Sequence, residues 1–186
     1  MKALVLSAGE GTRLGELTRQ KPKALVRLAG VPLLGRVLHN LREAGVHEVC
    51  IVIGFRGDEI REEISGDYAG LKVHYIENPD YEKGNLYSLH AARGFFERDN
   101  FLLCMTDHLF DTRIVEKLID WRLEGALALA IDRGRRYSAE ATKVLEQDGK
   151  IGDIGKSIKK MELHRHGVLL VLTKSLRILQ RGFEAG

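Results

Sequence analysis

Glycines and positive charges gather in one short segment near the N-terminus. Residues 7–14 (SAGEGTRL) directly follow an apolar run, and Gly9 and Gly11 let the backbone turn sharply and aim its N–H groups inward. Such a loop holds phosphate oxygens with backbone groups, and Arg13 adds a planar guanidinium group that is always positively charged. Lys23 follows within reach. We therefore expect this segment to bind an anion rather than to be a simple tight turn.

Two other nucleotide-binding motifs do not fit the chain. A dinucleotide-binding fingerprint needs a third glycine where Leu14 stands. A P-loop needs a glycine five residues before Gly-Lys-Ser, but residues 155–157 (GKS) have Lys150 at that position. These departures disfavour an NAD-dependent redox module and a P-loop enzyme.

An acidic residue follows the fourth expected strand. Asp107 and His108 come directly after the apolar residues 101–105. Ligands of open α/β sheets bind at the carboxyl ends of the strands, and a carboxylate there suits a hard cation such as Mg²⁺. The alternative is a solvated loop aspartate. Because the loop at residues 7–14 ends a strand of the same sheet, we favour a metal site at Asp107.

Residues 78–89 (NPDYEKGNLYSL) link an expected strand to an expected helix. Gly84 and Asn85 lie where that helix begins, and they can present an amide and backbone groups to the edge of a base. The alternative is that Asn85 caps the helix, and the two roles are compatible.

Two polar patterns in the back half are weaker signals. Alternation along an expected strand places Glu140 and Lys143 on opposite faces, and a phosphate ligand and an exposed edge lysine are both open interpretations of Lys143. Glu162, His164 and His166 also alternate and could hold a metal. A solvated surface strand is favoured for these three residues, because no other ligand converges there.

The elements that would position these groups alternate along the first two thirds of the chain. Apolar runs predict strands at residues 2–7, 48–53, 72–76, 101–105 and 126–131. Helical spacing of apolar residues predicts helices between Pro32 and Gly45 and at residues 58–64, 86–96 and 114–123. This order indicates an α/β fold with a mainly parallel sheet.

The pattern of elements changes in the back half. The expected elements there are a hairpin of residues 141–145 and 150–155 around residues 147–149, a strand at 167–172 and a helix start at 175–179. They predict a small antiparallel extension of a mixed sheet. No linker composition interrupts residues 1–186, so we expect a single domain. Because the chain stops shortly after a helix begins, we expect that domain to be C-terminally incomplete.

The composition excludes several classes of protein. The 186 residues carry 29 Lys and Arg against 26 Asp and Glu, and the net charge of +3 predicts no nucleic-acid partner. No apolar run approaches the roughly 18 residues of a membrane span, and no signal peptide is recognisable. Cys50 and Cys104 lie in apolar runs, which indicates reduced core thiols and a cytoplasmic protein. Seven Asn and Gln, with 17 Arg against 12 Lys, weakly favour a thermophilic source.

Residues 6–14 (LSAGEGTRL), followed by Pro22-Lys23, resemble the signature of the nucleotidyltransferase (nucleoside-diphospho-sugar pyrophosphorylase) family. Within that family, the chain resembles the CTP:inositol-1-phosphate cytidylyltransferases at residues 84–89 (GNLYSL), 107–108 (DH), 131–133 (IDR) and 140–144 (EATKV). Phosphocholine cytidylyltransferases are similar too. The resemblance covers about residues 1–175. It implies a Rossmann-like three-layer sandwich.

The resemblance also implies roles for the matching residues. Arg13, Lys23 and Asp107 would be catalytic, with Asp107 as the Mg²⁺ ligand and Lys23 between the α-phosphate and the incoming phosphate. The residues that bind CTP would be Leu6, Ala8, Gly9, Glu10, Gly11, Thr12, Arg13, Asn78, Gly84, Asn85 and Ser88, with Gly84 and Asn85 at the cytosine. The residues that bind the phosphomonoester would be Lys23, Asp132, Glu140 and Lys143.

On this resemblance we expect transfer of CMP from CTP to inositol 1-phosphate, giving CDP-inositol and pyrophosphate. Phosphocholine and hexose 1-phosphates are alternative acceptors, and the lack of clustered aromatic residues in the back half disfavours a quaternary ammonium group. The chain has residues 164–167 (HRHG) where the family has Asp-Thr-Gly, and it ends before the family's second acidic metal ligand. A nucleotide-binding but catalytically incomplete domain is therefore a further alternative. The oligomeric state is left open.

Overall fold

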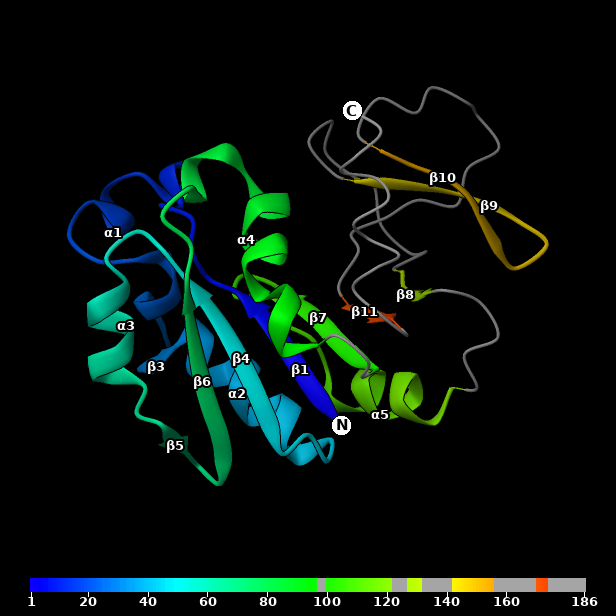
Figure 1. Ribbon diagram of the computed structural model, residues 1–186, viewed down its shortest axis with the longest axis horizontal. Helices are drawn as coiled ribbons and strands as arrows, with labels where there is room; N and C mark the ends of the chain where they lie inside the picture. The colour runs from blue at the N-terminus through cyan, green and yellow to red at the C-terminus, as the bar shows by residue number, and fades with distance from the viewer. Residues whose placement is uncertain (97–99, 122–126, 132–141, 156–169, 174–186) are drawn as a thin grey trace.

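Four parallel strands form the centre of the structure (Figure 1). They are β6 (Leu71–Glu77), β4 (Glu48–Ile53), β1 (Lys2–Leu6) and β7 (Phe101–Met105). The computed structural model describes residues 1–96, 100–121, 127–131, 142–155 and 170–173, and the side chains of Arg13 and of residues 170–173 lie outside the described part. Leu6 is paired with both Val52 and Met105, so β1 and β7 end at the same level and β4 ends one residue further on.

Three shorter strands complete a seven-stranded mixed sheet of order β5-β6-β4-β1-β7-β11-β8. Strand β5 (Asp67–Tyr68) is antiparallel to β6, and β11 (Leu170–Thr173) is antiparallel to both β7 and β8 (Leu127–Ala130). The strand predicted at residues 167–172 is therefore part of the main sheet. The predicted helix start at residues 175–179 lies outside the described residues.

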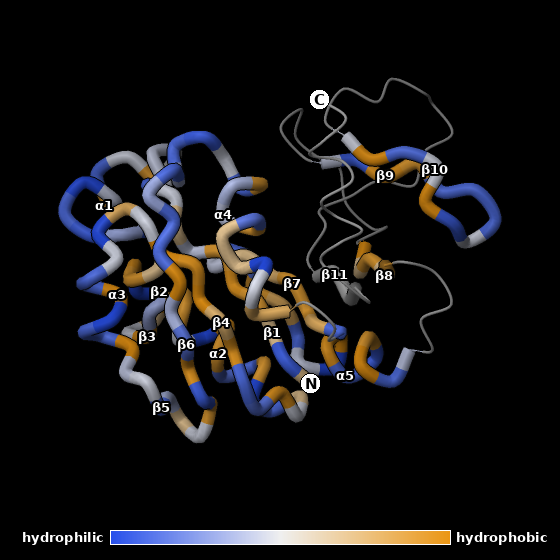
Figure 2. The backbone as a smooth tube through the Cα atoms, viewed as in Figure 1, coloured by the Kyte–Doolittle hydropathy of each residue, from blue (hydrophilic) through white to orange (hydrophobic). Residues whose placement is uncertain are grey.

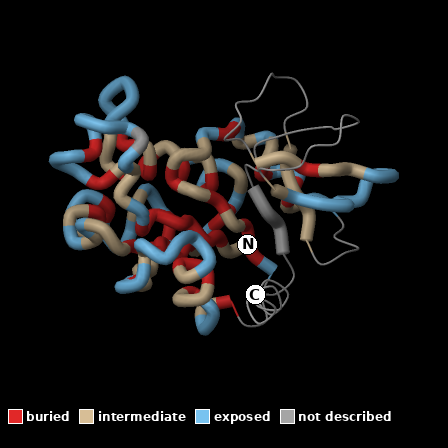
Figure 3. Tube along the Cα trace, turned by 90° about the horizontal axis from the view of Figure 1, so that it is seen from above, coloured by how far each residue is buried: buried red, intermediate tan, exposed pale blue. Residues whose placement is uncertain are grey.

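Alternate residues of β1 face hydrophobic clusters on opposite sides of the sheet. Ala3 and Val5 belong to one cluster, and Leu4 and Leu6 belong to the other. The first cluster is covered by α2 (Leu33–Glu43), α3 (Gly57–Glu63) and α5 (Thr112–Asp120), and the second by α4 (Asn85–Ala91) and the 3₁₀ helix η4 (Ala92–Phe95). The central strands are mostly hydrophobic in Figure 2, and Figure 3 shows a buried centre beneath exposed outer loops. The predicted three-layer α/β sandwich is confirmed.

Local signals explain where several helices begin and end. Helix α2 starts directly after Pro32, and the N–H groups of Gly45 and Val46 donate to the carbonyls of Arg42 and Leu41 at 2.9 and 3.0 Å. This is a Schellman motif, in which Gly45 adopts a φ of 84°. Helix α5 begins earlier than predicted, because the Asp111 carboxylate accepts a hydrogen bond from the N–H of Arg113.

The helix predicted at residues 86–96 is shorter in the structure. Helix α4 ends at Ala91, and the chain continues as η4, which contains Gly94. Glycine disfavours a helix interior, so the tighter 3₁₀ turn replaces the last α-helical turns.

The predicted hairpin forms a separate two-stranded sheet. Its strands are β9 (Lys143–Gln147) and β10 (Lys150–Gly155), joined by Asp148 and Gly149 with φ values of 51° and 74°. Two positive φ angles in a two-residue loop are typical of a type I′ turn. The first strand begins at Lys143 in the structure, and the predicted start at residue 141 lies outside the described residues.

Several short elements were not visible in the sequence pattern, because two to four residues are too few for a hydrophobic spacing to repeat. They are η1 (Thr12–Leu14), α1 (Glu16–Arg19), η2 (Lys23–Leu25), β2 (Arg27–Leu28), β3 (Val31–Pro32) and η3 (Tyr81–Lys83).

Cys50 on β4 and Cys104 on β7 are free and buried, as predicted. Burial raises the pKa of each thiol to about 12, so both are unreactive thiols of the core. Within the residues that the structure describes, no helix has the length and apolar character needed to cross a membrane. A cytoplasmic location stays a prediction.

Candidate functional site

The carboxyl ends of the central strands are tied together beyond the regular strand pairing. The backbone N–H and the hydroxyl of Thr106 both donate to the carbonyl of Leu6, at 3.3 and 3.1 Å. The N–H of Ser7 donates to the carbonyl of Val52 at 2.9 Å. These bonds fix the points at which the loops after β1, β4 and β7 leave the sheet, so polar side chains on those loops start from defined positions.

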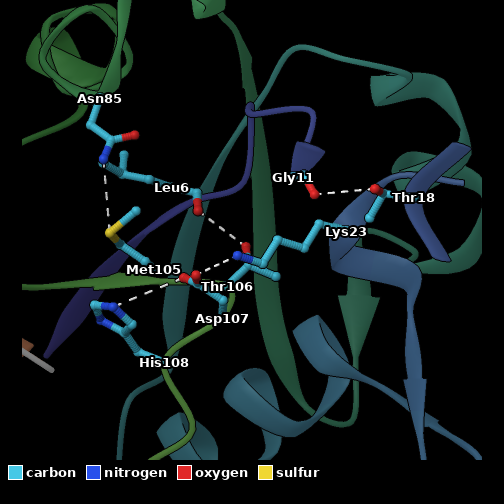
Figure 4. Close-up of polar contacts among 9 residues, drawn as sticks. All are labelled: Leu6, Gly11, Thr18, Lys23, Asn85, Met105, Thr106, Asp107 and His108. Atoms are coloured by element: carbon cyan, nitrogen blue, oxygen red, sulfur yellow. Dashed lines mark hydrogen bonds and ion pairs between the residues drawn. The ribbon is translucent and has the colours of Figure 1, made fainter. Parts of the chain in front are cut away.

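The glycine-rich loop, residues 7–14, packs directly against Lys23. Gly11 has a φ of 71°, a left-handed conformation that favours glycine, and a Cβ atom there would lie 2.7 Å from the Cβ of Lys23. The hydroxyl of Thr18, in α1, donates to the carbonyl of Gly11 at 3.1 Å (Figure 4). The same hydroxyl lies 3.2 Å from the carbonyl of Gly15. The loop is therefore fixed both to α1 and to the aliphatic stem of Lys23.

Lys23 and Asp107 form an ion pair at the carboxyl edge of the sheet (Figure 4). Asp107 lies in the turn that ends β7, which is closed by a 3.1 Å hydrogen bond from the N–H of His108 to the carbonyl of Met105. The Lys23 and Asp107 side chains keep 21% and 28% of their surface exposed. Both charges are therefore accessible to a ligand that enters beside the glycine-rich loop.

The surroundings of Asp107 keep its carboxylate ionised. Burial alone would raise the pKa of this carboxyl, but the hydrogen bond and the charge of Lys23 outweigh that effect. His108 adds to the lowering, with its Nε2 atom 4.0 Å from Oδ1 of Asp107. The resulting pKa lies below the ordinary value of 3.8, so Asp107 carries its negative charge at neutral pH.

The donor set around Asp107 fits a magnesium ion shared with a phosphate chain. Asp107 offers one ionised and partly exposed carboxylate. In the described part of the chain, no three His, Cys, Asp or Glu side chains are grouped so that they could hold a metal by themselves. Magnesium in nucleotide sites commonly uses one or two carboxylates together with phosphate oxygens and water. Mg²⁺ at Asp107 stays a prediction, with phosphate oxygens of a nucleotide as its expected co-ligands.

Two of the predicted nucleotide-binding residues hold the loop after β6 in place. Asn78 and Ser88 are 3% and 4% exposed, and the Asn78 amide donates to the Ser88 hydroxyl at 2.9 Å. The Asn78 amide oxygen accepts a 3.0 Å hydrogen bond from the N–H of Asp80. Because these polar groups are paired and buried, the structure gives Asn78 and Ser88 a positioning role, and direct contact with a nucleotide stays a prediction.

Asn85 stands at the other end of that loop. It is the first residue of α4, whose N-cap is Gly84 with no side-chain hydrogen bond, so the alternative of Asn85 as a helix cap is wrong. The side chain is exposed, and its Nδ2 atom contacts the sulfur of Met105 at 3.9 Å. The amide thus lies at the strand ends. The residue that it contacts, Met105, stands two positions before Asp107 in the chain.

Some of the remaining predicted site residues lie in the described part of the structure, and the others lie outside it. Ala8 is buried, and Gly9 has open space where a Cβ would stand. The backbone of Arg13 lies in η1. Lys143 opens β9 and is half-buried. The residues outside the described part are Asp132, Glu140, Glu162, His164 and His166. Within the described residues, the structure brings together the glycine-rich loop, Lys23 and Asp107.

Sequence reasoning missed two residues that shape this site, Thr18 and Met105. The hydroxyl of Thr18 reaches back seven residues to Gly11, a contact that no helical or strand period indicates. Met105 is the last residue of the apolar strand predicted at residues 101–105. Its position directly before Thr106 and Asp107 is the signal that could have singled it out.

A model of the MobA-like NTP transferase domain matches residues 3–177. The chain belongs to this family. The matched range contains the glycine-rich loop, Lys23 and Asp107, and the predicted nucleotidyltransferase family is confirmed.

This MobA-like NTP transferase domain is similar to several named proteins. It is 39% identical over 154 residues to CMP-5'-(3-aminopropyl)phosphonate synthase of Streptomyces rubellomurinus, covering 82% of this chain and 24% of that protein. It is 36% identical over 181 residues to the bifunctional IPC transferase and DIPP synthase of Rubrobacter xylanophilus, covering 96% and 40%. The chain therefore spans less than half the length of these curated relatives.

A solved structure shares the fold. The inositol-1-phosphate CTP transferase from T. maritima superposes with a TM-score of 0.80 at 24% sequence identity, covering all of this chain and 82% of that one. At this identity the likeness establishes the arrangement of strands and helices.

Proposed function

We propose that this domain transfers CMP from CTP to inositol 1-phosphate, giving CDP-inositol and pyrophosphate. The observation that carries the proposal is the Lys23–Asp107 pair beside the glycine-rich loop. The pair and the loop together offer a partly exposed positive charge, a carboxylate suited to Mg²⁺ and backbone groups suited to phosphate. The proposal treats residues 1–186 as a single domain.

The names of the relatives supply the substrates. The relative from Rubrobacter xylanophilus is named an IPC transferase, and the T. maritima protein of the same fold is named an inositol-1-phosphate CTP transferase. The Streptomyces relative is named for a CMP-linked product. CMP or CTP stands in the names of the Streptomyces and T. maritima proteins, and inositol 1-phosphate stands in the name of the T. maritima protein.

The reaction forms one P–O bond and breaks another. An oxygen of the acceptor phosphate attacks the α-phosphorus of CTP, and the bond from that phosphorus to the bridging oxygen breaks as pyrophosphate leaves with the electron pair. The acceptor phosphate is largely dianionic at neutral pH, because its second pKa is about 6. No general base is needed, so the protein contributes positioning and neutralisation of charge.

Each charged residue then has a defined task. Lys23 would leave Asp107 and reduce the repulsion between the α-phosphate and the acceptor phosphate. The backbone N–H groups of the glycine-rich loop, together with Arg13, would hold the leaving pyrophosphate. Asp107 would orient Mg²⁺ on the phosphate chain, where the bound ion supplies further neutralisation of charge.

A phosphonate acceptor is the second candidate. It is favoured by the 39% identity to a phosphonate-using relative over 82% of this chain. A phosphonate oxygen would attack the same α-phosphorus, so the roles of Lys23 and Asp107 would be unchanged.

Pyrophosphate release tests the proposal. The protein is incubated with Mg²⁺, one of the four nucleoside triphosphates and one acceptor: inositol 1-phosphate, 3-aminopropylphosphonate, phosphocholine or glucose 1-phosphate. We expect release with CTP and inositol 1-phosphate, and none without an acceptor. Release with another acceptor alone would reassign the substrate. CTP binding without release from any pair would favour the catalytically incomplete domain.

A further inference from the structure

The Asn85 carboxamide has one hydrogen-bonding contact among the described residues, the contact of its Nδ2 atom with the Met105 sulfur at 3.9 Å (Figure 4). An exposed amide without a partner would rotate freely between its two orientations. Met105 therefore gives Asn85 a directional preference, and that preference decides which atoms of the amide remain for a ligand.

The chemistry of the two groups fixes the orientation. A thioether sulfur accepts hydrogen bonds weakly and donates none, so the amide NH₂ rather than the amide oxygen faces it. Figure 4 shows Nδ2 directed at the sulfur and Oδ1 pointing away from Met105. The exposed oxygen of Asn85 is therefore left as an acceptor at the strand ends.

Met105 itself is held by the sheet. Its backbone is paired with Leu6 in β1, and its carbonyl accepts the 3.1 Å hydrogen bond from His108 that closes the turn around Asp107. The sulfur that orients Asn85 and the carboxylate that pairs with Lys23 thus belong to the same short turn.

We propose that Met105 is a positioning residue for base selection: it holds the Asn85 amide so that its oxygen accepts from the N4 amino group of cytosine. Uracil presents a carbonyl oxygen at the equivalent position, and two acceptors facing each other repel. This inference rests on the proposed function for CTP as the substrate, and on the family resemblance for the placement of cytosine at Asn85. It assigns the choice of CTP over UTP to a contact between two side chains.

Nucleotide binding tests this inference without the need for turnover. The dissociation constants of CTP and UTP are measured by calorimetry with Mg²⁺ for the wild type, Met105→Leu and Met105→Gln. Leucine keeps the volume but lacks an acceptor, whereas glutamine restores an acceptor through its side-chain oxygen. Leu103→Met, two residues earlier on the same face of β7, is the matched control.

The expected result is a change in the ratio of the two dissociation constants. Met105→Leu should lower the preference for CTP over UTP about twofold, as expected for the loss of one weak hydrogen bond to a thioether. Met105→Gln should keep the preference, and Leu103→Met should leave it unchanged. A purely structural role of Met105 would weaken the binding of both nucleotides equally.

Two results would overturn the inference. One is equal binding of CTP and UTP by the wild type, and the other is an unchanged ratio in Met105→Leu. Neither depends on catalysis, so a failure of the proposed function, seen as absent pyrophosphate release, is separate from a failure of this inference.

Discussion

Lys23 and Asp107, 84 positions apart in the chain, meet as an ion pair beside the end of β1. Gly11 packs against the stem of Lys23, and the Asp107 turn is tied through Thr106 to Leu6. Three segments distant in the sequence therefore converge on one pair of charges. In the absence of a nucleotide each charge neutralises the other, and a phosphate chain would offer Lys23 a competing partner.

Removal of either charge should abolish most of the activity without unfolding the protein. Lys23→Met and Asp107→Asn should each lower kcat/KM for CTP and the acceptor by about 10²–10³-fold, because each takes away electrostatic stabilisation of the transferring phosphate. The rate of pyrophosphate release measures the effect, and far-ultraviolet circular dichroism checks the fold. Lys117→Met, at an exposed position of α5, is the control for charge. Rates within threefold of the wild type in both variants would refute the assigned roles.

A side chain at Gly11 should damage both the loop and Lys23. The Cβ of Gly11→Ala would stand 2.7 Å from the Cβ of Lys23, at a φ of 71° that alanine rarely adopts. We expect a loss of about 1–3 kcal/mol in the free energy of unfolding, measured in urea, and a parallel loss of CTP affinity. Gly66→Ala has open space and an ordinary φ, so its stability should match the wild type. Equal stability of the two variants would contradict the close approach at Gly11.

The pair of Asn78 and Ser88 should matter for stability. Ser88→Ala leaves a buried amide N–H of Asn78 without its acceptor, which costs about 1–3 kcal/mol. Thermal unfolding of the nucleotide-free protein should show this loss. An unchanged Tm in Ser88→Ala would mean that water or another group replaces the hydroxyl.

The amino ends of the strands should contribute a stability that depends on pH. Burial works to raise the pKa of Glu48, but its hydrogen bond with His74 and the charges of Lys2, Lys72 and His74 outweigh burial, and the pKa lies below 4.5. A carboxyl with a lowered folded-state pKa stabilises the protein above its unfolded-state pKa, and that stability is lost as the pH falls through the folded-state value.

Glu48→Gln should therefore unfold at a lower temperature than the wild type at neutral pH. The difference in Tm should shrink as the pH falls below 4.5. A difference that stays constant from neutral pH into this acidic range would show that the carboxylate charge of Glu48 adds no stability.

Much of the fold could be predicted because its signals are local. The apolar run of β1 and the periodic residues of α2 each bury a continuous face, so their spacing reveals them. The place of β11 between β7 and β8 could not be predicted, because strand order depends on contacts between distant segments. The start of α5 was misplaced by two residues, because the Asp111 cap acts outside the apolar pattern.

The site was predicted in composition but not in geometry. Glycines, Lys23 and Asp107 are recognisable by residue type and by their place after strands. The pairing of Lys23 with Asp107 and the contact of Met105 with Asn85 depend on where the tertiary structure puts η2 and α4 relative to the end of β7, and these crossings join segments distant in the sequence. Nothing in the local sequence specifies those crossings.

The fate of the α-phosphate of CTP tests the central claim most directly. The protein is given CTP labelled at that phosphate, with Mg²⁺ and inositol 1-phosphate, and the products are separated by chromatography. Transfer predicts that the label appears in CDP-inositol, with one pyrophosphate released for each label transferred and no reaction without the acceptor. Label that stays in CTP, or that appears as free CMP or CDP, would contradict the claim that this domain is a cytidylyltransferase.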